Sequence, residues 1–343
     1  MGKSLRDLGY WFNQNDELRD EDGMSFKFTT QAEYEELGDA ITEYIYDRMQ
    51  KEYKLQRKPV RPVIDTNNHR RYDNFPDEHF GFVFVSPDWS KKETILVLIH
   101  GMGAVRAGQW GRKLIINECL DEGSQLPYIR NALQRDWGVV VLNTNHNSRI
   151  DENERKLSST SEKHAENAWH LCVDETEAKT IHVVAHSAGG SGISGIMKKY
   201  EDTRVKSIIL TDSWFTGPTV QAFVINFTAS KPMNAFKQKR KDFWEIYAGT
   251  NEHDRTSAAC IDAAFCAMDN WDANRTATFL VRIATLVRGG CQAAGWASEE
   301  LNDANGENDE NNKNNNENNE QGPSTAGGHT TPAERLARSF KSS

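Results

Sequence analysis

Short runs of apolar residues alternate along this chain with stretches of helical periodicity. Six runs predict strands, at residues 81–86, 94–99, 138–143, 181–185, 205–212 and 242–249. Several of these runs are apolar at nearly every position, which is typical of strands buried on both faces of a sheet. Helical patterns lie between them, near residues 109–133, 161–179, 190–200 and 256–268. The alternation predicts an α/β fold with a doubly wound, mostly parallel sheet and helices on both faces.

Three regions outside these runs have a different pattern. Residues 31–55 carry apolar side chains at three- and four-residue steps, which predicts a helix covering one edge of the sheet. Residues 58–80 are rich in Pro, Asn and Arg and predict an irregular connection. Residues 213–236 contain several aromatic side chains, and they predict either a lid over a pocket or an ordinary covering layer.

The stretch from Ile181 to Gly190 carries the first chemical signal. A β-branched run ends at Ala185, Ser187 follows, and small residues occupy positions 188–190. This order predicts a strand, a sharp turn and a helix, which is the nucleophile elbow of an α/β-hydrolase-like fold, with Ala185 replacing the usual first glycine. Small residues suit the turn because larger side chains would collide with the adjoining strand and helix. The alternative is a buried strand entering a helix, with Ser187 as a simple N-cap.

A second turn of this kind follows the apolar run at residues 94–99. In serine hydrolases a His-Gly-x-Gly turn after such a strand supplies a backbone N–H to the oxyanion hole. Met102 is the expected donor, with Gly103 as the less favoured choice, and Ala188 is the expected second donor. The alternative is a glycine turn that only ends a strand. The residues expected to support the site are His100, Gly101, Gly103, His186 and Gly189.

An acid and a histidine follow the elbow in the order that this architecture requires. Asp212 ends the strand at 205–212, on the sheet edge expected for Ser187, where a carboxylate can orient a histidine. His253 lies in a short loop between the last predicted strand and a helix, the usual place of the general base. Ser187, Asp212 and His253 are therefore the predicted nucleophile, acid and base. The alternative for Asp212 is a structural cap of the following turn.

Composition and charge narrow the class of protein. The chain has 343 residues, 37% of them hydrophobic, which is enough for one large domain with appendages. No apolar run reaches the roughly 18 to 20 residues of a membrane helix, so no membrane association is expected. Five cysteines without C-x-x-C spacing predict reduced thiols and no zinc site. The formal net charge of −9 argues against a broad nucleic-acid footprint, and neither a cofactor nor a metal is expected.

The last part of the chain differs from the rest in its amino-acid composition. Residues 302–321 are dominated by Asn, Glu and Asp and contain no aromatic residue. Such a segment cannot bury enough apolar surface to offset its ordering entropy, so a disordered tail is predicted. The expected organisation is an N-terminal covering segment at 1–80, a core at 81–290 and the tail at 291–343.

Several stretches together carry a resemblance to a known family. They lie at residues 96–110, 114–118, 184–190, 210–213 and 248–253. The string Arg106-Ala-Gly-Gln-Trp110 is the most specific of them, because general hydrolases do not need it. Over residues 8–286 the chain resembles the Arb-two (argonaute-binding) domain family, whose animal branch is named "family with sequence similarity one hundred and seventy-two".

This resemblance implies an α/β-hydrolase domain whose relatives associate with Argonaute proteins and act in small-RNA-mediated heterochromatin or in splicing regulation. Ser187, Asp212 and His253 occupy the matching positions of the triad. The expected protein is an Arb2-domain protein of the nucleus and cytoplasm with a competent hydrolase site for an ester, thioester or amide. Its expected partners are an Argonaute-type protein and chromatin or splicing factors. The alternatives are a plain cytosolic esterase or thioesterase, and a catalytically silent scaffold.

Overall fold

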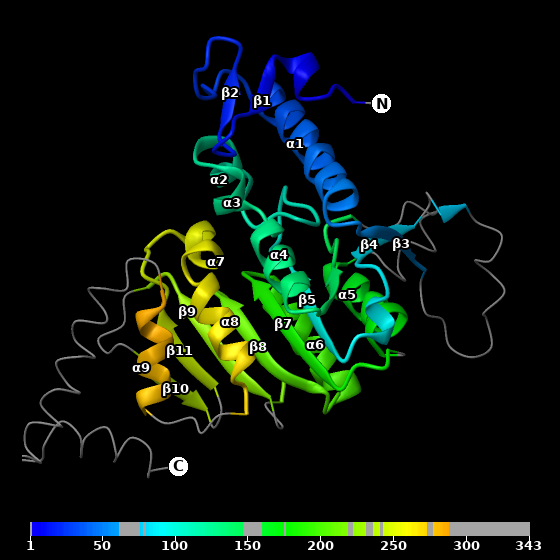
Figure 1. Cartoon of the computed structure of the whole chain (residues 1–343), viewed down its shortest axis with the longest axis vertical. Coiled ribbons are helices and arrows are strands. Elements are labelled where there is room, and N and C mark those ends of the chain that lie inside the picture. The colour runs from blue at the N-terminus through cyan, green and yellow to red at the C-terminus, as the bar shows by residue number, and fades with distance from the viewer. Residues whose placement is uncertain are drawn as a thin grey trace, which may run out of the picture.

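A nine-stranded sheet forms the centre of the described part of the chain (Figure 1). The computed structural model describes residues 2–61, 76–77, 80–146, 160–174, 176–218, 222–230, 236–240, 243–272 and 277–287. The strands follow one another across the sheet in the order β10 (Phe236–Arg240), β11 (Phe243–Tyr247), β9 (Phe223–Thr228), β8 (Val205–Thr211), β7 (Thr180–His186), β5 (Thr94–Ile99), β6 (Gly138–Val141), β4 (Gly81–Val85) and β3 (Gln56–Val60).

The strands from β11 to β6 are parallel, and the antiparallel pairs lie at the two ends of the sheet. This arrangement confirms the predicted α/β fold with its mostly parallel sheet. Parallel strands end at the same edge, so the loops after β5, β6, β7 and β8 all meet there. That edge is where the sequence places its candidate chemistry.

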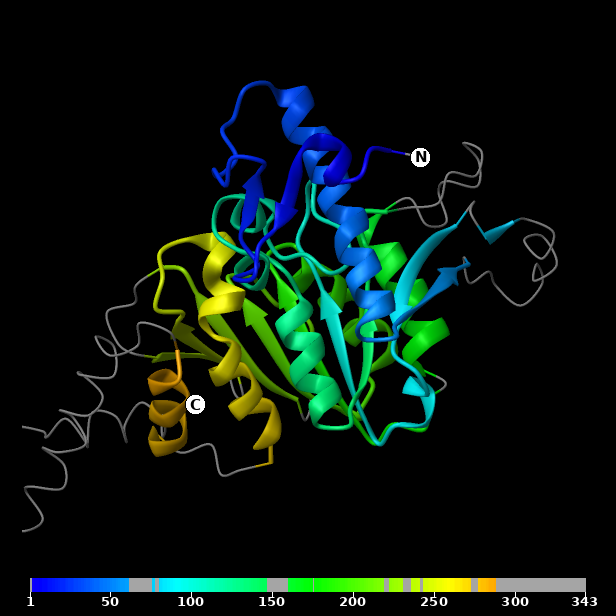
Figure 2. The same ribbon diagram turned by 45° about the horizontal axis from the view of Figure 1, so that its top comes forward.

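Helices cover both faces of the sheet (Figures 1 and 2). Leu96 and Leu98 of β5 belong to one hydrophobic core, together with side chains of α4 (Leu126–Gln134), α8 (Ile261–Asp269) and α9 (Ala277–Thr285). Ile95 and Val97 belong to the other core, with side chains of α5 (Ser161–Trp169) and α6 (Gly189–Tyr200). Successive side chains of a strand point to opposite faces, so a strand with a core on each side is apolar throughout.

The N-terminal part stands above the carboxyl ends of the strands (Figure 2). It consists of a 3₁₀ turn (Arg6–Leu8), a hairpin of β1 (Tyr10–Phe12) and β2 (Leu18–Asp20), and α1 (Gln31–Lys51). The Thr30 hydroxyl caps α1 by accepting a hydrogen bond from the Glu33 N–H at 3.2 Å. Tyr46 of α1 packs on Phe84 of β4 with ring centroids 5.1 Å apart, so the helix is anchored to the sheet. The predicted helix is therefore present, although it ends four residues earlier than residue 55.

Short helices line the carboxyl edge beside α1. They are α2 (Arg112–Asn117), α3 (Leu120–Gly123) and α7 (Thr256–Ala259). The first two and α4 confirm the helical pattern predicted over 109–133, which the structure divides into three helices. A 3₁₀ turn (Trp89–Lys91) connects β4 to β5.

The segment predicted as a lid or covering layer contains a central strand instead. β9 pairs in parallel with β8 and β11, and Phe223, Ile225 and Phe227 are buried in the core. The prediction was wrong for this stretch because Asn226 interrupts the apolar pattern. In the structure Asn226 is buried, and its side-chain amide is satisfied by the backbone of Ser213.

Other differences concern the ends of elements. β3 pairs with β4 through residues 58–60, which were predicted to be irregular. α5 ends at Trp169 and continues into a π-helical turn (His170–Asp174), so the helix does not reach residue 179. β10 and α9 had no counterpart among the predicted elements. The tail predicted at 291–343 lies outside the described residues.

No helix in the described ranges is long and apolar enough to cross a membrane. Four of the five cysteines lie in these ranges, and all four are free thiols: Cys119, Cys172, Cys260 and Cys266. Burial raises the pKa of Cys172 and Cys260 to about 12, so these thiols are protonated at neutral pH.

Candidate active site

Ser187 occupies a sharp turn between β7 and α6. Its backbone has a φ of +50°, a left-handed conformation that is unusual for a residue with a side chain. The Ser187 N–H donates to the Thr211 carbonyl at 3.1 Å, which extends the pairing of β7 and β8 into the turn. A Cβ at Gly189 would lie 2.7 Å from the Ile99 carbonyl oxygen, so only glycine fits there. These features are those of a nucleophile elbow.

Asp212 occupies the corresponding position after β8. His186 and Thr211 are paired in register, so Ser187 and Asp212 are the next residues along two neighbouring strands. Asp212 also has a left-handed backbone, with a φ of +46°. Its N–H donates to the Phe227 carbonyl at 2.7 Å, and its Oδ1 accepts from the Ala229 N–H at 3.0 Å. Strand β9 therefore fixes Asp212 in place.

His253 meets Asp212 from the other side of the edge. It begins a 3₁₀ turn (His253–Arg255) that leads into α7, and the Thr256 hydroxyl holds this turn by donating to the His253 carbonyl at 2.8 Å. The His253 Nδ1 lies 2.5 Å from the Asp212 Oδ2. The acid and the base predicted from the sequence are therefore in direct contact.

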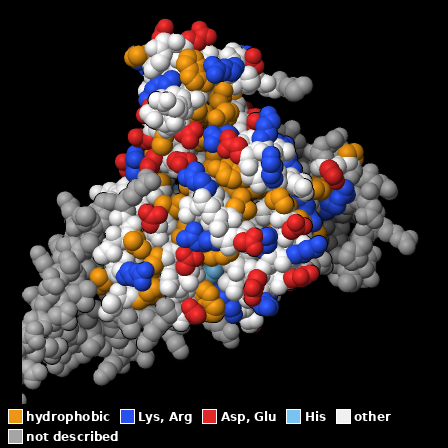
Figure 3. Space-filling view, viewed as in Figure 1, with side chains coloured by type: hydrophobic (Ala, Val, Ile, Leu, Met, Phe, Trp, Pro, Cys, Tyr) orange, Lys and Arg blue, Asp and Glu red, His pale blue; other side chains and the backbone are white. Residues whose placement is uncertain are grey.

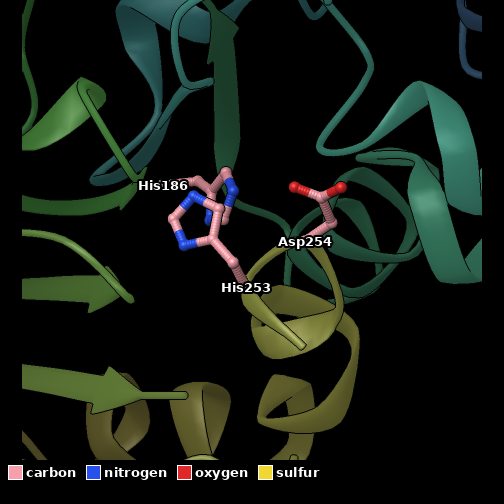
Figure 4. Close-up of side chains that lie close together, drawn as sticks. All are labelled: His186, His253 and Asp254. Carbon is pink, nitrogen blue, oxygen red and sulfur yellow. The ribbon is translucent and has the colours of Figure 1, made fainter. Parts of the chain in front are cut away.

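His186 lies between the elbow and His253. The two imidazole rings have centroids 4.7 Å apart (Figure 4). His186 is fully buried, and burial lowers its pKa to about 3. Its Nδ1 lies 2.9 Å from the Thr211 carbonyl oxygen, which can only accept, so this nitrogen carries the proton. His186 thus supports the turn as a neutral ring.

No hydrogen bond joins the Ser187 hydroxyl to His253 among the contacts of the described residues. In hydrolases without a ligand this bond is often long, and it tightens when substrate binds. The structure thus brings the predicted acid and base together beside the elbow and leaves the last proton-transfer contact unformed.

The turn after β5 approaches Ser187 closely. A Cβ at Gly101 would lie 3.0 Å from the Ser187 Cβ, so this position must be glycine for the two turns to meet. The backbone amides of Met102 and Ala188 have no hydrogen-bond acceptor within the part of the chain that the structure describes. Neither amide is therefore committed to another acceptor in these ranges, and their role in an oxyanion hole stays a prediction.

Two residues hold this turn in place. The His100 Nδ1 donates to the Gly101 carbonyl at 2.7 Å, and burial lowers the pKa of His100 to about 4. The Asn145 side chain donates to the same carbonyl at 2.9 Å and to the Val105 carbonyl at 3.0 Å. Asn145 is not among the site residues predicted from the sequence, and no sequence signal gave it this particular role.

The Arg106–Trp110 string connects the site to its surroundings. The Ala107 N–H donates to the Asn143 side chain at 2.9 Å, and the Gln109 side chain donates to the Thr42 hydroxyl of α1, also at 2.9 Å. Trp110 is buried with its ring 6.2 Å from that of His186. The string therefore connects the N-terminal part to His186 beside the elbow. A hydrolase without this N-terminal part has no need of such a connection.

A small cavity lies beside the elbow. A cavity of about 10 Å³ is lined by residues of the elbow and of the turn after β5, among them Met102 and Ala188. A larger groove of about 520 Å³ lies away from the triad, between the β1–β2 hairpin and α1. Apolar side chains reach the surface in this N-terminal part, and acidic and basic side chains are interspersed over the face shown in Figure 3.

The sheet order and the elbow place the protein in the class of α/β-hydrolase folds. Within this class the chain belongs to the Arb2 domain family, whose model matches residues 1–227. A FAM172 family protein homologue of Caenorhabditis elegans is 42% identical over 276 residues, which cover 76% of this chain and 85% of the relative. The cotranscriptional regulator ARB2A of Homo sapiens is 28% identical over 330 residues, which cover 74% and 77%. A histone deacetylase from Saccharomyces cerevisiae is a structural neighbour, with a TM-score of 0.46, 14% identity and coverage of 71% and 100%.

Proposed function

We propose that this Arb2 domain is a serine hydrolase that acts on an ester, thioester or amide. The contact of 2.5 Å between His253 and Asp212, at the strand ends beside the elbow of Ser187, is the observation that carries the proposal. A cap of the following turn would need only the Ala229 contact of Asp212. The second carboxylate oxygen is used to hold a histidine.

The contact defines how the triad works. Because the Nδ1–H of His253 donates to Asp212, the Nε2 lone pair is free to accept the proton of the Ser187 hydroxyl. The serine oxygen attacks the substrate carbonyl, and the amides of Met102 and Ala188 stabilise the negative charge of the tetrahedral intermediate. Protonated His253 then gives its proton to the leaving group, and water hydrolyses the acyl-enzyme by the same steps.

The small size of the cavity beside the elbow favours a particular kind of substrate. The cavity of about 10 Å³ beside the elbow has room for about one water molecule, so no long acyl chain is buried there. Met102 and Trp214 are exposed, and they come from the two loops that adjoin the elbow. A short acyl group suits a cavity of this size.

A fluorophosphonate probe tests the hydrolase on the purified full chain. We expect labelling of the parent protein and of Ser191→Ala, which removes a hydroxyl one turn into α6, and no labelling of Ser187→Ala. If the parent protein is labelled no more strongly than Ser187→Ala, the proposed hydrolase activity is refuted.

The relatives' names support a setting for this activity. ARB2A is named a cotranscriptional regulator, so the proposed site of action of this chain includes the nucleus as well as the cytoplasm. The proposed partners are an Argonaute-type protein and chromatin or splicing factors. Immunoprecipitation of the parent and of Ser187→Ala should recover Argonaute equally, because association does not require catalysis. Failure of both proteins to recover Argonaute would refute this part alone.

A further inference from the structure

A second constellation of side chains shares one residue with the triad. His186, His253 and Asp254 each offer a ligand atom, and these atoms all lie within 4.8 Å of one another. Figure 4 shows the two imidazoles lying against each other, with the Asp254 carboxylate on the side of His186. Asp212 belongs to the triad, whereas Asp254 has no part in the mechanism above.

Both histidines are held in the tautomer that metal ions require. The Nδ1–H of His186 donates to the Thr211 carbonyl at 2.9 Å, and the Nδ1–H of His253 donates to the Asp212 carboxylate at 2.5 Å. Each contact leaves the lone pair on Nε2. A backbone carbonyl or a carboxylate behind a ligating histidine is the usual outer support of a metal site.

The Nε2 atoms and Asp254 are also without other partners. Within the described ranges, no hydrogen bond reaches Nε2 of His186 or of His253, and no hydrogen bond or ion pair involves Asp254. His186 is 2% exposed, and one of its ring nitrogens lies within 4.8 Å of the ligand atoms of His253 and Asp254. A Cβ at Gly111 would lie 3.0 Å from the Asp254 Cβ, so glycine leaves space for this side chain beside the cluster.

We propose that Nε2 of His186, Nε2 of His253 and the carboxylate of Asp254 bind a divalent transition-metal ion of the Zn²⁺ type. Two imidazoles and one carboxylate match the three protein ligands of open zinc sites, whereas Mg²⁺ and Ca²⁺ prefer oxygen ligands alone. Zinc bonds of about 2.0–2.1 Å place tetrahedral ligands about 3.3 Å apart, so the side chains must approach by up to roughly 1.5 Å. His253 is exposed and Asp254 is only partly buried, and both lie on one short turn, so these two side chains can move towards the buried His186.

The ion would control the hydrolase, and this consequence rests on the proposed function. Nε2 of His253 cannot bind a metal and accept the serine proton at the same time. Zinc binding therefore inhibits the triad without occupying the acyl site.

Titration of Zn²⁺ into the untagged, chelator-treated full chain tests the site. We expect one equivalent to bind, at least tenfold weaker binding by Asp254→Asn, and loss of this binding in His253→Gln. Glu252→Gln, a neighbouring carboxylate outside the cluster, is the control and should bind as the parent does. Absence of binding, or equal binding by the parent, Asp254→Asn and His253→Gln, would overturn the proposal.

Two further measurements separate this site from the cysteines and from the hydrolase. Co²⁺ bound by nitrogen and oxygen should give visible absorption without a strong thiolate band in the near ultraviolet, and such a band would contradict the proposal. Ser187→Ala should bind Zn²⁺ as the parent does, so the site stands or falls independently of catalysis. In a labelling-competent protein, one equivalent of Zn²⁺ should slow fluorophosphonate labelling at least tenfold, and unchanged labelling at saturation would disprove the inhibition.

Discussion

Ser187 and Asp212 follow neighbouring parallel strands and both have left-handed backbones, with φ values of +50° and +46°. Each residue ends its strand by turning away from the sheet at the same edge. For a residue with a Cβ this conformation costs roughly 1–2 kcal/mol. The structure therefore contains backbone strain at two of the three residues of the proposed triad, where positioning of a side chain is the evident gain.

The strain at Ser187 predicts an order of stability between two variants. Glycine adopts a left-handed φ without cost, whereas alanine keeps the strain, so Ser187→Gly should be more stable than Ser187→Ala by about 1 kcal/mol. At Ser191, inside α6, the order should be reversed by about the same amount because glycine is a poor helix former. Urea unfolding of the four variants measures both differences. If the alanine variant is the more stable one at both positions, the elbow is not strained.

The contact between Asp212 and His253 predicts a large kinetic effect. Asn tolerates a left-handed backbone, so Asp212→Asn should fold, but it no longer stabilises protonated His253. Its rate of fluorophosphonate labelling should fall by about three to four orders of magnitude. Asp88→Asn makes the same chemical change at another left-handed position, with a φ of +52°, and should label like the parent. A loss of less than tenfold in Asp212→Asn would rule out the assigned role.

The position of β9 in the sheet predicts that its side chains are essential for stability. Ile225 is fully buried between β8 and β11, so Ile225→Ala should lower the free energy of unfolding by about 2–5 kcal/mol. Met24 is about half exposed, and Met24→Ala should change the free energy of unfolding by no more than about 0.5 kcal/mol. Urea denaturation compares the two variants with the parent. If Ile225→Ala lowers the free energy of unfolding as little as Met24→Ala does, β9 is loosely packed, as a lid would be.

Buried neutral histidines predict a loss of stability in acid. Burial lowers the pKa of His182 from 6.5 to about 3, so between these values the unfolded chain binds a proton that the native protein does not. The contribution of this histidine to the free energy of unfolding is therefore fully present above pH 6.5 and declines as the pH falls towards 3. His100, His164 and His186 behave in the same way.

Each of these histidines adds about one proton to the difference in proton binding between the unfolded and native states. Replacement of one of them should therefore make the free energy of unfolding fall less steeply as the pH decreases. His182→Gln should make the fall in unfolding free energy between pH 5.5 and 4.5 shallower by about 1.4 kcal/mol per pH unit. Urea unfolding at several pH values measures these slopes, and an unchanged slope in His182→Gln would show that its ring is protonated in the native state.

The sequence by itself determined the local features of this protein. The apolar runs at 94–99 and 138–141 identified buried strands because a strand covered on both faces needs apolar residues throughout. The small residues around Ser187 identified the elbow, and the order of Ser187, Asp212 and His253 gave the candidate triad. These signals lie within short windows, so they can be read without knowledge of the fold.

The tertiary structure decided what depends on neighbours from distant segments. β9 was missed because a buried Asn226 is tolerable only where the Ser213 backbone satisfies its amide. Asp254 gained meaning only when the turn after β11 brought it beside His186 of β7. Pairing of strands and approach of loops are fixed by the packing of the whole core, so residues far apart in the chain become one site only after folding.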